Sequence, residues 1–428
     1  MRVAVVGAGF TGLSAAVELV DNGVEVEVFE KEGKVGGLAG GLKISESRII
    51  DETNTTNKSV TTNKKDNLFE DPWSLEFFYH HIFSNDEEII EMAKKVGLPA
   101  KFYSPDTSSF INGKIIRLDS PLSVLTFSEI SLISRIWMGV GLAILKIIPN
   151  GMFLEKYKVV ELLPKLIGAE AYQTIWEKLM KAKFGSKITD VNMAWFWSRV
   201  AKRTKKLGYF DGGFENLAVK MKEYIEKRGG KINLNTELKL ESKVAKGFDK
   251  IIVTTPAPVA EKILGRKLMP KINYLWAQTL ILELKQSLMK VYWLNILEKK
   301  WPFLVAVEHT NFIDKDKYNN KTILYLGNYL EEDSKLLKMN KDELIDLYSS
   351  YLKKINQTFE KNWIISSTLT QKPFSQPVFP LNYSQELRKV PKSEGKYLFA
   401  NMSMVYPFDR GTNYAVKMGV DIAKLCLQ

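Results

Sequence analysis

The chain has 428 residues, more than a single hydrophobic core usually organises, so two or three domains are expected. Hydrophobic residues make up 45% and charged residues 26%, a balance that excludes disorder of the whole chain. The single cysteine, Cys426, excludes a disulfide within the chain. With one cysteine and three histidines, we expect no metal site. The formal net charge is +12, but its lysines are scattered, so we expect no nucleic-acid partner.

The first thirty residues predict a strand, a helix and a second strand. Residues 2–6 read RVAVV, which is typical of a parallel strand buried on both faces. Residues 13–20 form a run rich in alanine and leucine that predicts a helix, and residues 24–29 predict the second strand. No basic and apolar leader precedes the first strand, so we expect a cytoplasmic protein.

Between the first strand and the helix, Gly7, Gly9 and Gly12 form the pattern G-x-G-x-x-G. The first glycine permits the tight turn, the second lets the backbone approach a pyrophosphate, and the third lets helix and strand pack closely. The helix N-terminus then faces the phosphates. Glu30 ends the second strand, where an acid binds a ribose diol and disfavours the 2′-phosphate of NADP. These features predict a dinucleotide site.

After Glu30 the chain reads KEGKVGGLAG, with the pair Gly36 and Gly37 in one short loop. This resembles the second glycine signature of the superfamily of amine oxidases, protoporphyrinogen oxidases and phytoene desaturases. The resemblance implies FAD as the cofactor, with the glycine pair passing close to the flavin and its phosphates. Lys34 stands where an arginine is usual. The contacts implied for this stretch are Gly7, Ala8, Gly9, Phe10, Thr11, Gly12, Glu30, Lys31, Lys34, Gly36, Gly37 and Leu38.

A second stretch is similar to another FAD segment of that superfamily. The run YFDGG at residues 209–213 precedes a predicted helix with Leu217, Met221 and Ile225 on one face. Predicted strands follow at residues 231–234, 236–240 and 249–255. The alternative is a βαβ unit unrelated to FAD.

The C-terminal stretch resembles the end of the same superfamily, with a strand at 396–400, a loop and a helix at 414–427. Thr412 or Asn413 would be the N-cap of the helix. Ala400 and Asn401 stand where an acidic residue is usual, and Asp409 could replace it. The implied flavin contacts here are Asn401, Gly411, Thr412, Asn413 and Tyr414.

These segments predict an α/β fold: a Rossmann-like FAD-binding domain assembled from three segments, with a substrate domain of antiparallel sheet plus helical cap. The FAD-binding domain would comprise residues 1–76, 206–258 and 386–428. Residues 77–205 would form the helical cap, and residues 259–385 the substrate-binding sheet. Residues 45–71 contain a run rich in Asn, Thr and Lys that predicts a flexible insertion without a catalytic role.

The candidate catalytic residues are the histidines. His80 and His81 lie in the run FYHHIF, which distantly resembles the HIFHT segment of UDP-galactopyranose mutase, where the histidine lies beside the flavin. His309 follows the apolar strand FLVAV in the sequence EHTN, and polar residues just past a buried strand often face a ligand. The alternatives are satisfied buried histidines and the end of a surface hairpin. Lys181 and Lys183 are weaker candidates for a pocket-facing lysine.

Residues 121–149 form the most apolar stretch, interrupted by Arg135 and Lys146. The uninterrupted part is about half the length of a membrane-spanning helix. It predicts either a core helix or a helix lying in the plane of a membrane, which would give peripheral contact with the inner face of the membrane.

The leading hypothesis is an FAD-dependent oxidoreductase (a dehydrogenase, desaturase or oxidase). It would take a hydride from an apolar, isoprenoid-like or porphyrinogen-like substrate and pass the electrons to an unknown acceptor. One alternative is a redox-neutral flavoenzyme similar to UDP-galactopyranose mutase, although Arg117, Arg199 and Arg203 are isolated in the sequence and do not form an evident diphosphate clamp. The other alternative is a non-catalytic flavin-binding protein.

Overall fold

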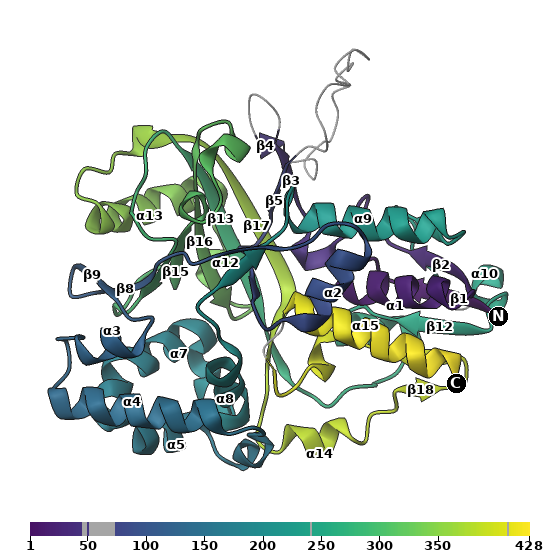
Figure 1. Ribbon diagram of the computed structural model, residues 1–428, viewed down its shortest axis with the longest axis horizontal. Coiled ribbons are helices and arrows are strands. Elements are labelled where there is room, and N and C mark those ends of the chain that lie inside the picture. The colour runs from purple at the N-terminus through teal and green to yellow at the C-terminus, as the bar shows by residue number, and fades with distance from the viewer. Residues whose placement is uncertain (45–48, 51–72, 240–241, 409–410) are drawn as a thin grey trace.

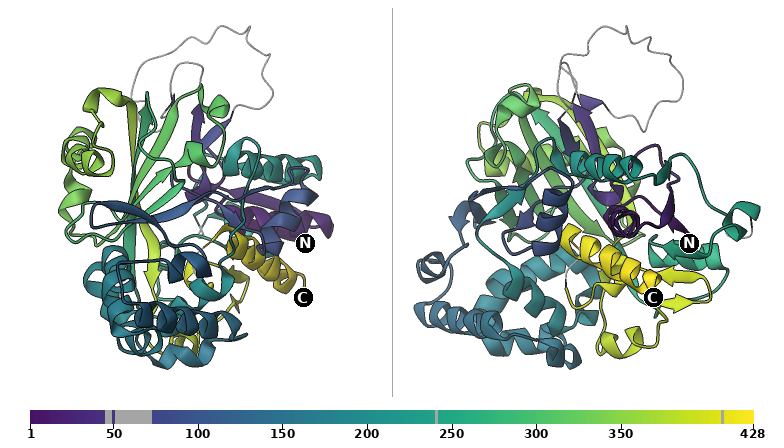
Figure 2. Two further views of the ribbon diagram at one scale, coloured as in Figure 1. Left: turned by 60° about the vertical axis from the view of Figure 1, so that its left-hand side comes forward. Right: turned by 45° about the vertical axis from the view of Figure 1, so that its right-hand side comes forward.

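The computed structural model describes residues 1–44, 49–50, 73–239, 242–408 and 411–428. Figure 1 shows a mostly parallel sheet near both chain termini, a large antiparallel sheet, and a layer of helices below it. The two views in Figure 2 show the same arrangement from other sides. The predicted insertion at 45–71 lies almost wholly outside the described residues.

The parallel sheet has the strand order β11-β2-β1-β12-β19-β18, and all but the last strand run parallel. Its strands are β1 (Arg2–Val6), β2 (Glu25–Phe29), β11 (Lys231–Asn233), β12 (Lys250–Val253), β18 (Ser393–Glu394) and β19 (Tyr397–Phe399). Three separate stretches of chain therefore build one sheet, and the predicted three-segment fold is confirmed.

The strand predicted at residues 236–240 is wrong for its described part, because residues 236–239 have no strand structure. The chain turns directly after β11, where Asn235 has a φ of 51° and its N–H donates to Glu32 O at 3.0 Å. Thr236 N then donates to Glu30 O at 2.8 Å. These bonds tie the turn to the end of β2, and Leu238 is buried in the core instead of alternating along a strand.

Helices cover the parallel sheet and pack closely on one another. They are α1 (Phe10–Asp21), α2 (Glu87–Lys95), α9 (Gly213–Lys227), α10 (Lys243–Lys246), α11 (Ala257–Leu264), α14 (Tyr383–Leu387) and α15 (Thr412–Leu427). Figure 1 shows α15 lying alongside α1. A Cβ on Gly419 of α15 would lie 2.2 Å from Thr11 O of α1, so glycine permits this approach of the two helices.

The second large sheet has the order β17-β13-β16-β15-β14-β8-β9 and is antiparallel except where β14 pairs with β8. Its strands are β8 (Thr107–Ile111), β9 (Lys114–Arg117), β13 (Asn273–Leu284), β14 (Trp293–Ile296), β15 (Val305–Glu308), β16 (Thr322–Leu330) and β17 (Ile364–Val378). Side chains alternate along β13: Leu280, Leu282 and Leu284 pack in the cluster with α13 (Lys341–Ile355), and Ile281 packs in the cluster shared with the parallel sheet. The antiparallel sheet therefore packs against the parallel-sheet layer with one face.

The helical layer contains α3 (Pro121–Leu125), α4 (Leu132–Ile147), α5 (Val159–Ile167), α6 (Ala169–Ala171), α7 (Glu177–Phe184) and α8 (Met193–Lys202). Small pieces connect the layers: β3 (Gly41–Ile44), β4 (Ile49–Ile50), β5 (Ser74–Glu76), β6 (Ile82–Phe83), β7 (Lys101–Tyr103), β10 (Leu207–Tyr209) and α12 (Lys335–Lys338). Within the described residues, none of the helices has the length and apolar character needed to cross a membrane.

Two glycines in helix interiors give a matched test of this packing. Gly419→Ala should lower the melting temperature, because overpacking at such a contact costs about 1–3 kcal/mol. Gly139→Ala in α4 adds a Cβ that has no heavy atom within 4 Å, and it should keep or raise the melting temperature through the higher helix propensity of alanine. Thermal unfolding of the two variant proteins and the wild type measures both shifts. Equal shifts in the two variants would contradict the role of Gly419.

Candidate functional site

The first turn of α1 forms the cradle that the glycine pattern predicts. Gly9 is its N-cap and provides no capping side chain, so first-turn N–H groups and the positive end of the helix dipole are available to an anion. A Cβ on Gly12 would lie 1.9 Å from Gly7 O, which explains why only glycine fits against the turn. Ala8 and Phe10 point into the core, while Thr11 is partly exposed.

The second glycine loop lies directly against the first. Gly36 N donates to Ala8 O at 2.9 Å, and Gly9 and Gly36 form a parallel bridge. A Cβ on Gly37 would lie 3.2 Å from the Gly9 Cα, so the two backbones approach without side chains between them. Gly36 and Gly37 both have positive φ, 105° and 59°. Side chains at these glycine positions would fill the space between the two loops. Without them, the two loops form a cradle that fits a bound dinucleotide.

Glu30 is held at the edge of the cradle. Its Oε2 accepts from Ala8 N at 2.8 Å and its Oε1 accepts from Glu32 N at 3.0 Å. Each carboxylate oxygen has two lone pairs, so both retain capacity for ribose hydroxyls. The neighbouring Lys31 is exposed and pairs with Glu32 at 3.7 Å.

Lys34 contacts the chain that follows the glycine pair. Its ammonium group donates to Gly41 O at 2.5 Å and lies 4.3 Å from the centre of the Phe77 ring. Leu38 lies between them in a short 3-10 turn. Lys34 therefore braces the loop against β3 and the aromatic run after β5.

The N-terminus of α15 differs from the prediction in its capping. Gly411 is the N-cap, and neither Thr412 nor Asn413 caps the helix, so that prediction is wrong. Asn413 is instead buried against α2, where its Oδ1 accepts from Ile89 N at 3.0 Å and its Nδ2 donates to Glu88 Oε2 at 2.8 Å. The helix N-terminus is thereby left without a side-chain cap.

The other predicted residues of the C-terminal stretch have separate surroundings. Asn401 is buried, and its Oδ1 accepts from Ser403 N at 3.0 Å. The Tyr414 ring stacks on Phe408 with 4.6 Å between centroids and an interplanar angle of 6°. Asp409, the predicted substitute for the missing acid, lies outside the described residues.

The aromatic run after β5 lies against the antiparallel sheet. Tyr79 packs on β16, where a Cβ on Gly327 would lie 2.4 Å from a Tyr79 ring carbon. His80 Nδ1 is 2.5 Å from Phe78 O. Because a carbonyl oxygen only accepts, this contact assigns the proton to Nδ1 and leaves Nε2 as the basic nitrogen. A cavity beside the run is lined by Phe78, Tyr79, His80, Ala277, Thr279, Asn328 and Tyr329.

His81 lies in an aromatic environment beside the same run. Its Nδ1 is 3.1 Å from the Tyr292 hydroxyl, and its ring has edge contacts with Phe83, Tyr292 and Trp293. Burial, with smaller effects from Arg203 and other cations, lowers the pKa of His81 to about 3. The imidazole is therefore neutral at physiological pH.

His309 is buried in the core beneath the sheet. Its Nε2 is 2.7 Å from the Tyr318 hydroxyl, while its Nδ1 has no partner among the described residues. Burial lowers the pKa of His309 to about 3. The neighbouring Glu308 accepts from Leu288 N and Met289 N, both at 2.9 Å. The side chains of the EHTN segment thus bond to neighbouring parts of the chain. The sequence pattern, in contrast, predicts that they face a ligand.

The two candidate lysines of α7 lie in different surroundings. Lys181 pairs with Glu177 at 2.7 Å on the exposed side. Lys183 lies 5.0 Å from the Trp195 ring and 4.8 Å from the ring of Tyr329, which lines the cavity beside His80. Of the two candidates, Lys183 is the one next to the cavity.

Glu76 is a buried acid that the sequence analysis missed. Its Oε2 accepts from the Tyr209 hydroxyl at 2.6 Å and its Oε1 accepts from Phe214 N at 2.7 Å, at the first turn of α9. Burial raises the pKa of Glu76 to about 7, with a smaller contribution from Glu215. A lone acid in the apolar run before the histidine pair was the signal that could have revealed it.

Comparison with known proteins gives the family. The sequence matches the flavin-containing amine oxidoreductases over residues 10–407. The chain belongs to this family. It is therefore a flavin-dependent oxidoreductase whose cofactor is FAD. This membership favours an enzyme over the non-catalytic flavin-binding alternative.

Solved structures of low sequence identity share the fold. Reduced UDP-galactopyranose mutase has a TM-score of 0.72 at 15% identity, covering 100% of this chain and 95% of the mutase. A putative protoporphyrinogen oxidase from Exiguobacterium sp. 255-15 has a TM-score of 0.70 at 13% identity, covering 99% and 98%. A zeta-carotene desaturase from Synechocystis sp. is 58% identical over 40 residues, which is 9% of this chain and 8% of the desaturase.

The raised pKa of Glu76 predicts a specific pH dependence. Its value in the folded protein, about 7, lies above the ordinary 4.5, so the folded state binds the proton more tightly than the unfolded state. This group therefore makes the free energy of unfolding fall as pH rises from about 4.5 to 7, and it adds no further change above that range. Glu76→Gln keeps an acceptor for Phe214 N and should flatten that part of the profile. Urea unfolding across this pH range tests it, and superimposable profiles would refute the assignment.

Proposed function

We propose that this FAD enzyme takes a hydride from an apolar, isoprenoid-like or porphyrinogen-like small molecule. The observation that carries the proposal is the character of the surface around His80, where Phe78, Tyr79 and Ala277 share the cavity lining with Thr279, Asn328 and Tyr329. His81 beside it is uncharged at physiological pH. None of these lining side chains is an acid, a lysine or an arginine, so the lining itself offers no counterion to an ionic substrate.

Bound FAD supplies the two-electron acceptor for this chemistry. We assign its binding to the segments 1–76, 206–258 and 386–428, with substrate residues in 77–205 and 259–385. The paired glycine loops would hold the diphosphate, and Glu30 would hold the ribose. Gly411, Thr412 and Asn413, at the uncapped start of α15, would offer N–H groups to the flavin.

The histidines would have different roles. His80 is the candidate catalytic residue, since its Nε2 is the basic nitrogen and its ring borders the cavity. A proton leaving the substrate as the hydride departs could be accepted there. His81 and His309 lie within hydrogen-bonding distance of the buried hydroxyls of Tyr292 and Tyr318, and we assign no reaction step to them.

The relatives support this class of substrate without defining it. One structure of the same fold is a putative protoporphyrinogen oxidase, and a short stretch matches a zeta-carotene desaturase. The reaction and the acceptor of the electrons are decided by the pocket and its surroundings, which vary within one fold.

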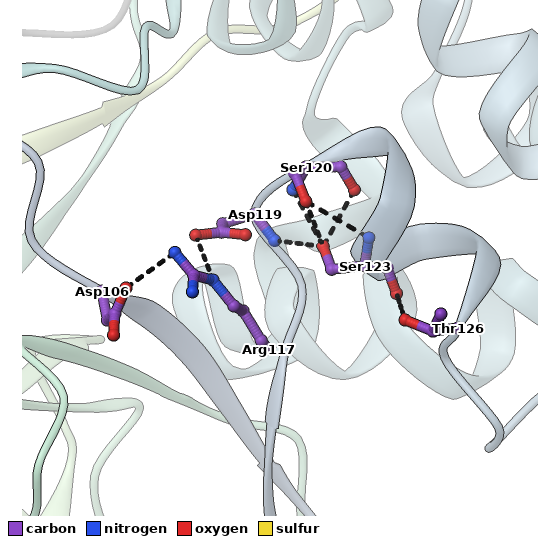
Figure 3. A network of polar contacts seen from close by, with 6 residues as sticks. All are labelled: Asp106, Arg117, Asp119, Ser120, Ser123 and Thr126. Atoms are coloured by element: carbon purple, nitrogen blue, oxygen red, sulfur yellow. Dashed lines mark hydrogen bonds and ion pairs between the residues drawn. The ribbon is translucent and has the colours of Figure 1, made fainter.

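A sugar-nucleotide mutase is the second candidate, favoured by the likeness to UDP-galactopyranose mutase. The arginines argue against it. The Arg117 guanidinium pairs with Asp106 at 2.7 Å and with Asp119 at 2.8 Å, and both pairs can be followed in Figure 3. The Arg199 guanidinium lies 5.1 Å from the centre of the Trp195 ring. Arg117 is thus already neutralised, so it is a poor member of a diphosphate clamp.

Anaerobic mixing separates the two candidates. The FAD-loaded enzyme should lose its oxidised-flavin absorbance on mixing with a porphyrinogen or a polyene precursor. Pre-reduced enzyme should leave UDP-galactopyranose unchanged. Conversion of the sugar nucleotide with no flavin reduction by any apolar donor would reverse the assignment.

His80→Ala should slow flavin reduction by about 10²–10⁴-fold, the usual contribution of a general base. FAD content and melting temperature should stay at the wild-type values, because His80 is only partly buried. Stopped-flow absorbance with saturating substrate measures the rate. An unchanged rate at full FAD occupancy would remove His80 from the mechanism.

Two glutamates two positions apart test the ribose contact. Glu30→Gln should weaken FAD binding by on the order of ten- to a hundredfold, since it weakens charge-assisted hydrogen bonds. Glu32→Gln is the matched control, because Glu32 is exposed and pairs only loosely with Lys31. Titration of FAD-free protein, followed by flavin fluorescence, gives both dissociation constants. Similar constants for the two variants would contradict the contact.

A further inference from the structure

Helix α4 is apolar on two opposite sides. Its inner side packs Met138, Gly141 and Leu145 into the helical layer, where a Cβ on Gly141 would lie 2.3 Å from Leu166 O. Its outer side exposes a set of large apolar side chains: Ile133, Ile136, Trp137, Val140, Ile144 and Ile147. A contiguous exposed apolar patch of this kind marks a site of contact with another protein or with a membrane.

The outer residues form one continuous surface, called here the α4 face. At 100° per residue they fall within an arc of roughly 100°, and no polar side chain interrupts it. Ile133 and Ile147, near its two ends, are 75% and 76% exposed. Leu122 and Leu125 of the adjoining α3, and Phe153 and Tyr157 after α4, are also exposed. Figure 1 shows α4 at the outer edge of the molecule, away from both termini.

The polar side chains of α4 are all engaged within the protein. Ser134 Oγ donates to Glu170, and Arg135 donates to Ile130 O at 2.9 Å. Trp137 Nε1 donates to Leu166 O at 3.1 Å, and Lys146 Nζ donates to Ala201 O at 2.8 Å and Arg203 O at 2.7 Å. The α4 face therefore presents hydrocarbon and an aromatic ring, without a polar group that needs a partner.

We propose that the α4 face docks the protein on the surface of an anionic lipid bilayer, with α4 lying in the plane of the membrane. Lipid hydrocarbon forms no hydrogen bonds, which matches the α4 face because that face has no polar group in need of a partner. Protein interfaces, in contrast, carry about one hydrogen bond per 100–200 Å². The half-exposed Trp137, with its N–H satisfied, matches the aromatic side chains that settle at membrane interfaces. The described helices are too short to cross a bilayer, which leaves docking on its surface.

The charge of the chain favours anionic lipid. The net charge is +12, and Lys156 and Lys165 are exposed in the elements that follow α4. Glu155, the acid beside Lys156, is buried, where it accepts from Ser384 N at 3.0 Å. Basic residues next to a docked apolar helix are attracted to a negatively charged surface.

Vesicle sedimentation of the FAD-loaded protein tests the proposal. The probes are vesicles of phosphatidylcholine alone and of phosphatidylcholine mixed with phosphatidylglycerol. Wild-type protein should bind the mixed vesicles more strongly than the neutral ones, and added salt should reduce that difference. Val140→Glu should weaken binding on the order of tenfold or more, because it places a charge in hydrocarbon.

Val244→Glu is the matched control. Val140 and Val244 are 55% and 56% exposed, and Val244 lies on α10 beside the parallel sheet. Both variants should keep wild-type FAD content and melting temperature, and Val244→Glu should bind vesicles as the wild type does. Equal weakening in the two variants, or no sedimentation of the wild type, would overturn the proposal.

A second copy of the chain is the competing occupant. Light scattering of the lipid-free protein should show a monomer. A dimer that Val140→Glu dissociates, together with no vesicle binding, would assign the α4 face to self-association and overturn lipid docking. These measurements do not depend on flavin reduction, so failure of the proposed reaction leaves them interpretable.

Discussion

The fold depends on close backbone approach at its glycines. Gly12 lets α1 start against the turn after β1, and Gly37 lets the second loop lie against Gly9. Gly419 lets α15 pack on the first turn of α1. Because side chains are missing at these contacts, stretches from both ends of the chain converge around one helix N-terminus. The N–H groups there are the strongest reason for an anionic cofactor to bind at this place.

Local patterns were enough to predict the parts of the site that lie near one another in sequence. The strand, glycine turn, helix and acid of the first thirty residues follow periodicity and spacing, and the structure has β1, α1 and β2 at those positions. The helix behind YFDGG was predicted for the same reason, and Leu217, Met221 and Ile225 on its predicted face are fully buried. Such features need no knowledge of distant segments.

Contacts between distant segments could not be predicted in this way. Asn413 follows the rules for an N-cap, yet α2 provides it with a donor and an acceptor, and that pairing prevails. Glu76 is bonded to Tyr209 and Phe214, 133 and 138 positions away. The single acid of an apolar run gives no indication of which groups will satisfy it. The missing strand near residue 236 has the same origin, since bonds to Glu30 and Glu32 redirect the chain.

The balance of charge inside and outside the protein connects the site with the surface. Three cations have neighbours within the protein that stabilise their charge. Arg117 pairs with two aspartates, Lys34 contacts a carbonyl oxygen and the Phe77 ring, and Lys183 lies near the rings of Trp195 and Tyr329. Burial keeps His81 neutral for the same reason, because a charge away from water is costly without a counterion. A basic chain with an exposed apolar helix is the combination that the proposed docking on an anionic bilayer requires, because the two attractions, electrostatic and hydrophobic, then act together.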